Sequence, residues 1–183
     1  MRCPWCGEDP LYIRYHDEEW GRPLYDEDKL FEFLILETFQ AGLSWRTILH
    51  KREAFRQALD NFDAAKIASY DSDKIQALLA NTGIIRNRAK ILATIHNAQA
   101  YLQLKEQGSF AEWLWQHVDK QPQRNQWQKL SDIPVSTPTA EILTRNLKKA
   151  QFKFVGSATV YAFMQATGMV NDHLVTCDWY GKG

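Results

Sequence analysis

From Asp26 onward the sequence is a succession of helix starts and helix stops, and this pattern constrains the fold more than any other feature. Asp26 is a suitable N-cap for a helix to about Ala41, Gly42 ends that helix, and Ser44 opens a second helix to about Leu59. The same signals predict two short helices after Asp63 and Ser72, the second ended by Gly83, and helices over about 87–106, 109–117, 137–150 and 156–167. Apolar–polar alternation between tight turns, the pattern of a strand, is absent. The predicted fold class is all-α.

A length of 183 residues predicts one domain over 1–183, with two helical lobes around a shared core as an alternative arrangement. The first 25 residues and the last dozen are predicted to be irregular. The sequence contains no run of about 18 apolar residues, so no membrane span is predicted. The N-terminus also lacks the pattern of a signal peptide. We therefore expect a cytoplasmic protein that does not bind a membrane. As a separate expectation, we take it to be a monomer. Formal net charge is zero, so a nucleic-acid-binding chain of this kind must gather its basic residues on one face.

The two irregular ends contain five candidate metal ligands, which are Cys3, Cys6, His16, His173 and Cys177. His173 and Cys177 are spaced i, i+4 and would share one face of a helical turn. Cys3 with His16, or Cys3 with Cys6, could complete a tetrahedral site, and separate thiols with surface histidines are the alternative. A site with four protein ligands has no open position for water, so such a metal would be structural.

Glu37 lies on the apolar face of the first long helix, at helical spacing from Leu30, Phe33 and Leu34. A carboxylate there is costly unless a cleft solvates it or a specific partner binds it, which makes it a candidate for a functional role. The alternative is a glutamate that curls to solvent at the edge of the apolar stripe.

Five segments of the chain, in order, resemble DNA-3-methyladenine glycosylase I: RCPWCGEDPLYIRYHDEEWG, LETFQAGLSW, TGIIRNRAKI, FKFVG and NDHLVTC. They cover residue 2 to about residue 177. The resemblance implies an α-helical member of the helix-hairpin-helix glycosylase superfamily in which a zinc ion joins the termini. It also implies a zinc set of Cys3, His16, His173 and Cys177. Cys6 departs from the family pattern, which has a single cysteine in the opening motif.

The resemblance further implies a base pocket in which Glu37 is the catalytic residue. The aromatic residues that would bind the base are Trp5, Tyr12, Tyr15, Trp20 and Trp45. Methylation at N3 makes adenine cationic and weakens its glycosidic bond, so the enzyme needs selectivity more than acid catalysis. Electron-rich rings favour a cationic base. Glu37 would accept hydrogen bonds from the exocyclic amino edge. We find no lysine nucleophile or aspartate of the superfamily's other members, which predicts hydrolysis by water, an abasic product and no strand cleavage.

Contacts with damaged double-stranded DNA are predicted in two places. Leu43 is the candidate wedge that fills the gap left by the flipped base, with Gln40 beside it, although Leu43 could also be a core residue at a helix junction. The hairpin TGIIRNRAK would bind the DNA backbone through Gly83, Arg86, Arg88 and Lys90. Lys148, Lys149 and Lys153 form a second basic cluster, and either cluster could be an ordinary solvated face. Two other functions remain open, namely a zinc hydrolase and a non-catalytic zinc-containing DNA-binding module.

Overall fold

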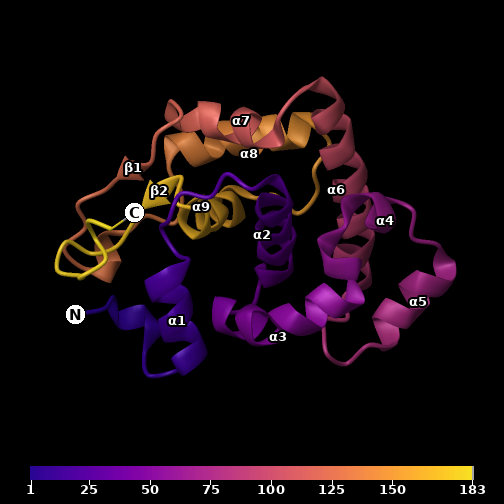
Figure 1. The fold of residues 1–183 in the computed structure, drawn as a ribbon, viewed down its shortest axis with the longest axis horizontal. Coiled ribbons are helices and arrows are strands. Elements are labelled where there is room, and N and C mark those ends of the chain that lie inside the picture. The colour runs from indigo at the N-terminus through magenta and orange to yellow at the C-terminus, as the bar shows by residue number, and fades with distance from the viewer. Residues whose placement is uncertain (183) are drawn as a thin grey trace.

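The computed structural model describes residues 1–182, and these are mostly helical (Figure 1). The helices are α1 (Pro10–Glu18), α2 (Glu27–Gln40), α3 (Trp45–Ala58), α4 (Ala64–Ala68), α5 (Ser72–Ala80), α6 (Arg88–Gln107), α7 (Phe110–Trp115), α8 (Pro138–Lys149) and α9 (Ser157–Ala166). Single 3-10 turns lie at Pro4–Cys6, Asp60–Phe62, Gln116–Val118 and Leu130–Asp132. The prediction of a helical fold is confirmed for the described residues.

Helix α2 is the centre of the core. Its ten consecutive residues from Leu30 to Phe39 are buried, and it contacts α3, α6, α7 and α9. A helix that is apolar around most of its circumference is stable only when other helices surround it. Asp26 caps its N-terminus by accepting a hydrogen bond from the Lys29 N–H, as predicted. The side chain of Ser44 caps α3 in the same way.

The two ends of the chain meet on one side of the molecule, where Figure 1 places both termini near α1 and the short strands. The N–H of Gly21 donates to Gln165 O and that of Leu24 donates to Thr167 O, so the segment after α1 is bound to the end of α9. Gly168 permits this approach, because a Cβ atom there would lie 2.1 Å from the carbonyl carbon of Arg22.

Four local predictions need correction. The N-terminal 25 residues are not all irregular, because Asp9 caps α1 and Pro10 occupies its first turn, a start signal that the sequence carries. The N-cap of α5 is Asp71 instead of Ser72. Helix α5 ends at Ala80, three residues before Gly83. Strand structure is not absent either, since β1 (Gln123–Arg124) pairs in parallel with β2 (Val170–Asn171). Two-residue strands are too short to show alternation.

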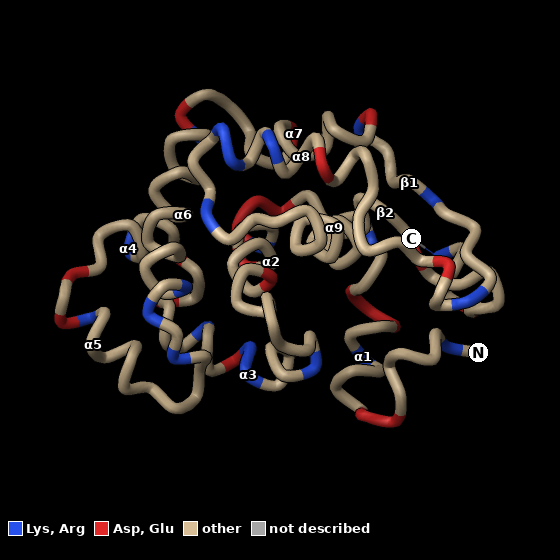
Figure 2. The backbone as a smooth tube through the Cα atoms, turned by 180° about the vertical axis from the view of Figure 1, so that it is seen from behind, with Lys and Arg blue, Asp and Glu red and all other residues tan. Residues whose placement is uncertain are grey.

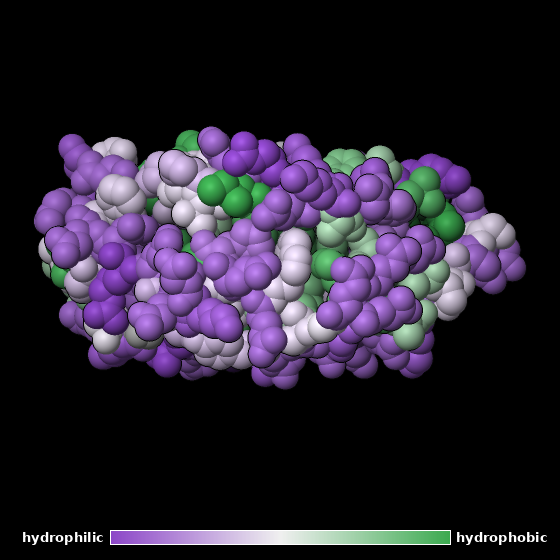
Figure 3. Space-filling model, turned by 90° about the horizontal axis from the view of Figure 1, so that it is seen from above, coloured by the Kyte–Doolittle hydropathy of each residue, from purple (hydrophilic) through white to green (hydrophobic). Residues whose placement is uncertain are grey.

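On the face seen from above in Figure 3, hydrophilic side chains predominate and hydrophobic ones form small, separate patches. Within residues 1–182, no helix is long and apolar enough to cross a membrane.

Candidate functional site

A cavity of about 200 Å³ brings together residues that the sequence analysis selected for base binding. Its lining is Trp5, Tyr12, Tyr15, Trp20, Glu37, Gln40, Trp45, Ile133, Ala162 and Gln165. The predicted catalytic residue, all five predicted aromatic residues and Gln40 therefore share one cavity. The first four aromatic residues come from the N-terminal segment, whereas Glu37 and Trp45 come from α2 and α3.

The aromatic side chains contact one another and form a continuous wall. The ring centroid of Trp5 lies 4.9 Å from those of Tyr12 and Trp20. Tyr15 lies 5.4 Å from Trp45, which itself stacks on Phe33 in the core. Each ring of the wall thus contacts a neighbour, and such aromatic pairs stabilise one another beyond the area that they bury.

Glu37 is the one acidic side chain among the described residues that line this cavity. It is only 3% exposed, and its Oε2 atom is buried without a hydrogen-bond partner. Burial raises the pKa of the Glu37 carboxyl well above its usual range. The indole Nε1 of Trp45 is also buried and unpaired. The alternative of a glutamate that reaches solvent is thus wrong, and two residues of the cavity lining each carry a buried polar atom without a hydrogen-bond partner.

Beside the aromatic wall, four buried side chains converge on a point where a metal ion could bind. They are Cys3, His16, His173 and Cys177, and their ligand atoms all lie within 4.8 Å of one another. The Cys177 Sγ atom is 3.5 Å from His16 Nε2 and 3.5 Å from His173 Nδ1, and Cys3 Sγ is 3.6 Å from His173 Nδ1. Residues 172–174 are irregular and residues 175–178 form a turn, so the i, i+4 pair converges without helical geometry.

Each histidine is held with one ring nitrogen directed at this cluster. His16 Nδ1 is 2.8 Å from Asp17 Oδ1, and His173 Nε2 is 3.1 Å from Trp20 O. Since both partners accept hydrogen bonds, these nitrogens carry the protons and the other two nitrogens face the cluster, where His16 Nε2 also accepts a hydrogen bond from the Cys3 N–H at 3.3 Å. Cys6 lies outside the cluster and donates its thiol hydrogen to Cys3 O.

The metal-ligand cluster and the cavity wall share contacts. The His16 ring centroid lies 5.2 Å from that of Trp5, and the His173 ring centroid lies 4.7 Å from that of Trp20. The two histidines therefore contact two residues of the aromatic wall, so the geometry of the cluster affects the position of the wall.

The residues predicted to contact DNA have different environments. Leu43 is 43% exposed on the loop between α2 and α3, which excludes the core role, and Arg86 and Arg88 are exposed at the start of α6. Gly83 packs against α3, where a Cβ atom would lie 3.1 Å from Ala54 Cβ.

Lys90 requires a correction. It is only 6% exposed, and its Nζ donates to Phe39 O and Ala41 O at 2.7 and 2.6 Å. Its ammonium group thus caps the carboxyl end of α2, where the helix dipole favours a cation. Lys90 does not present its charge to a phosphate, and we remove it from the predicted DNA contacts.

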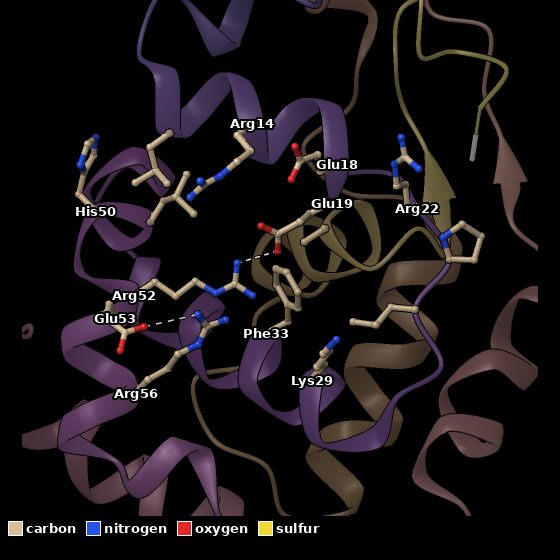
Figure 4. Close-up of a pocket in the computed structure, with 15 residues that line it drawn as sticks. Arg14, Glu18, Glu19, Arg22, Lys29, Phe33, His50, Arg52, Glu53 and Arg56 are labelled. Carbon is tan, nitrogen blue, oxygen red and sulfur yellow. Dashed lines mark hydrogen bonds and ion pairs between the residues drawn. The ribbon is translucent and has the colours of Figure 1, made fainter.

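A larger cavity of about 720 Å³ lies between α1, α2 and α3, and Figure 4 shows its charged lining. Arg52 pairs with Glu19 and Glu32, and Arg56 pairs with Glu32 and Glu53. Because these opposite charges neutralise one another, this cavity lacks the unpaired buried groups that distinguish the smaller one.

Sequence reasoning missed three residues of the cavity lining, Ile133, Ala162 and Gln165. The first precedes α8 and the others lie on α9, segments in which no chemical pattern pointed to a ligand. Asp172 was also missed, although it is fully buried and accepts hydrogen bonds from four side chains. The signal available in the sequence was an aspartate directly before a predicted metal ligand, His173.

Comparison with known proteins agrees with this geometry. The sequence pattern of the methyladenine glycosylase family matches residues 5–180. The chain belongs to this family. A methyladenine glycosylase from Escherichia coli (strain K12), DNA-3-methyladenine glycosylase 1, is 50% identical over 180 residues, which are 98% of this chain and 96% of that protein.

Solved methyladenine glycosylase structures have the same fold. A crystal structure of 3-methyladenine DNA glycosylase I is 51% identical, with a TM-score of 0.95 over 97% of this chain and 98% of that one. A tyrosine-to-phenylalanine variant of 3-methyladenine DNA glycosylase I, crystallised in complex with 3-methyladenine, is 39% identical, with a TM-score of 0.93 over 97% of this chain and 96% of that one. The predicted family and helical fold are confirmed.

Proposed function

We propose that this protein is a DNA repair glycosylase that flips 3-methyladenine out of alkylated DNA and hydrolyses its N-glycosidic bond. The observation that carries the proposal is the unpaired, buried carboxyl group of Glu37 in a cavity walled by five aromatic side chains. A cavity of about 200 Å³ suits a single base better than a larger ligand. Family membership and the relative solved with bound 3-methyladenine support the same substrate.

Selectivity for a cationic base follows from the state of Glu37. Burial raises the pKa of the Glu37 carboxyl group, which favours its neutral form. A cationic base close to it favours the carboxylate, whereas a neutral base offers no such compensation. The aromatic wall adds a preference for the cation over the neutral base. Glu37 would accept a hydrogen bond from the exocyclic amino group and stabilise positive charge as the bond breaks.

The cavity favours a monofunctional reaction. Among the described residues that line it, there is no lysine that could form a covalent intermediate with the sugar. Water would then be the nucleophile, and the product would be an abasic site without a strand break.

We propose that the buried cluster of Cys3, His16, His173 and Cys177 binds a structural zinc ion. Tetrahedral zinc with bonds of about 2.3 Å to sulfur and about 2.0–2.1 Å to nitrogen places sulfur and nitrogen roughly 3.6 Å apart. The three sulfur–nitrogen distances of 3.5–3.6 Å fit this geometry. When bound, the ion would join the two termini and fix α1, which holds Tyr12 and Tyr15 in the cavity wall.

We propose a DNA-binding surface formed by the α2–α3 loop and the start of α6. Lys90 on α6 bonds to Ala41 O, so the exposed Leu43 and the N-terminus of α6 belong to one rigid unit. Arg86 and Arg88 are exposed there and make no ion pair with any described residue. Figure 2 shows lysine and arginine positions along α3 and near the adjoining end of α6. These exposed basic residues beside Leu43 support the proposal of a phosphate contact at this surface.

Release of free bases from alkylated DNA tests the proposed function. Wild-type protein should release 3-methyladenine, leave 7-methylguanine in place and produce no strand break, and Glu37→Gln should lose most of this activity. Glu106→Gln, which changes an exposed glutamate on α6, is the matched control and should retain it.

Absence of base release by folded, zinc-containing protein that still binds DNA would overturn the enzyme assignment and favour the non-catalytic DNA-binding module. A zinc hydrolase is disfavoured, because four protein ligands leave no position for water.

A further inference from the structure

Gln165 contributes an amide group to the base cavity from α9, and this amide has a fixed orientation. Its Nε2 donates a hydrogen bond to Asp172 Oδ2 at 2.8 Å. Its Oε1 makes no hydrogen bond with any described residue. A glutamine that is free to rotate about its last bond can present either a donor or an acceptor to a ligand, whereas one whose nitrogen is committed elsewhere presents its carbonyl.

Asp172 is well suited to lock this orientation. It is fully buried, and its Oδ1 accepts from Asn125 Nδ2 at 2.7 Å and from Trp127 Nε1 at 2.8 Å. Its Oδ2 accepts from Tyr161 Oη at 2.5 Å as well as from Gln165. A carboxylate with four donors around it offers only acceptors. If the Gln165 amide turned over, two oxygens would face each other in a buried site, which is strongly unfavourable.

We propose that Gln165 is a specificity-determining residue that reads the 6-amino group of the flipped base, and that Asp172 is its positioning residue. The proposal deepens the function proposed above and rests on it. Adenine presents an amino donor at C6, where guanine presents a carbonyl acceptor. The locked carbonyl of Gln165 can pair with the amino group and not with the carbonyl. An amino group has two N–H donors, so Glu37 can satisfy one and Gln165 the other.

The cavity contains an internal comparison. Gln40 also lines it, from the end of α2, but its side chain makes no hydrogen bond with any described residue. Its amide is therefore free to turn, and it can adapt to a donor or to an acceptor on the base. The two glutamines have the same side chain in the same cavity and differ in whether a buried carboxylate fixes them.

Binding of free bases to the intact protein tests the proposal. The ligands are 3-methyladenine and 3-methylpurine, which lacks the 6-amino group, and quenching of tryptophan fluorescence is the readout. Gln165→Leu should weaken binding of 3-methyladenine about tenfold and change binding of 3-methylpurine less than about threefold. Gln40→Leu should show no such difference between the two ligands. An equal loss for both ligands in Gln165→Leu would overturn the proposal, because a merely structural role affects both alike.

Asp172→Asn tests the orienting step. Because the new amide can accept or donate, the Gln165 amide can turn over, and the preference for 3-methyladenine over 3-methylguanine should fall at least threefold. Metal content and thermal stability of the same samples show whether the neighbouring His173 remains in place. An unchanged preference in a folded, metal-containing variant would overturn the role of Asp172. If wild-type protein binds neither methylated adenine nor methylated guanine, it is the proposed function that fails.

Discussion

Removal of the proposed metal should lower the free energy of unfolding by an amount that depends on the length of the loop that the metal closes. Cys3 and His173 are separated by 170 positions, so an ion that binds both closes a loop of most of the chain. By the entropy of loop closure, a cross-link of this length stabilises the folded state by about 5 kcal/mol. For a domain of this size, 1 kcal/mol corresponds to roughly 2–4 °C in Tm. Chelation should therefore lower Tm by roughly 10–20 °C.

Thermal unfolding with and without a chelator, together with measured metal content, provides the assay. Cys177→Ser should contain little metal, have a low Tm and respond weakly to the chelator. Cys6→Ser is the matched control, since Cys6 is equally buried but lies outside the ligand cluster. Its metal content and chelator response should match those of wild type. Equal metal content in Cys177→Ser and wild type, or a Tm unaffected by complete metal removal, would refute the reasoning.

Three further predictions follow from the site. Trp45→Leu removes stacking and cation–π interactions worth about 2–4 kcal/mol, so kcat/KM for 3-methyladenine should fall roughly 30- to 1000-fold. Trp115→Leu changes a tryptophan outside the cavity and should lower only the Tm. Lys90→Met leaves the carbonyls of Phe39 and Ala41 without the Lys90 ammonium, so DNA affinity and Tm should fall. The slope of log affinity against log salt concentration should stay unchanged, because no phosphate contact is lost. A slope smaller by about 1 would show instead that Lys90 contacts a phosphate. Burial raises the folded-state pKa of Glu37, so the unfolded state ionises first and wild-type stability falls as pH rises above about 4.5 toward the folded-state pKa. Glu37→Gln does not titrate, and its Tm relative to wild type should rise across this range; a constant difference from pH 5 to 8 would contradict the raised pKa.

The base cavity shows how far sequence reasoning can reach. Glu37 was identified because a charge at an apolar position is visible in the pattern, and its burial confirms that it lies on the buried face of α2. Gln165 was not identified, because a polar residue at the edge of a helix has no unusual pattern. Its role depends on Asp172, and only the packing of α9 against the C-terminal segment places the two side chains 2.8 Å apart.

The sequence by itself determined where several of the helices begin. Asp26 and Ser44 were predicted to open the first two long helices, and Ser109 and Thr137 are the first residues of the helices predicted over about 109–117 and 137–150. Each of the four side chains accepts a hydrogen bond from a backbone N–H three residues later. A cap depends only on residues within one turn, so it can be read without knowledge of the rest of the chain.

Tertiary structure decided the matters that depend on distant partners. It separated Cys6 from the ligand cluster and converted Lys90 from a predicted phosphate contact into a cap for α2. It also brought segments from both ends of the chain together around one cavity. Local patterns fix which backbone groups need a partner, but whether a buried charge or amide finds one depends on which element folds against it.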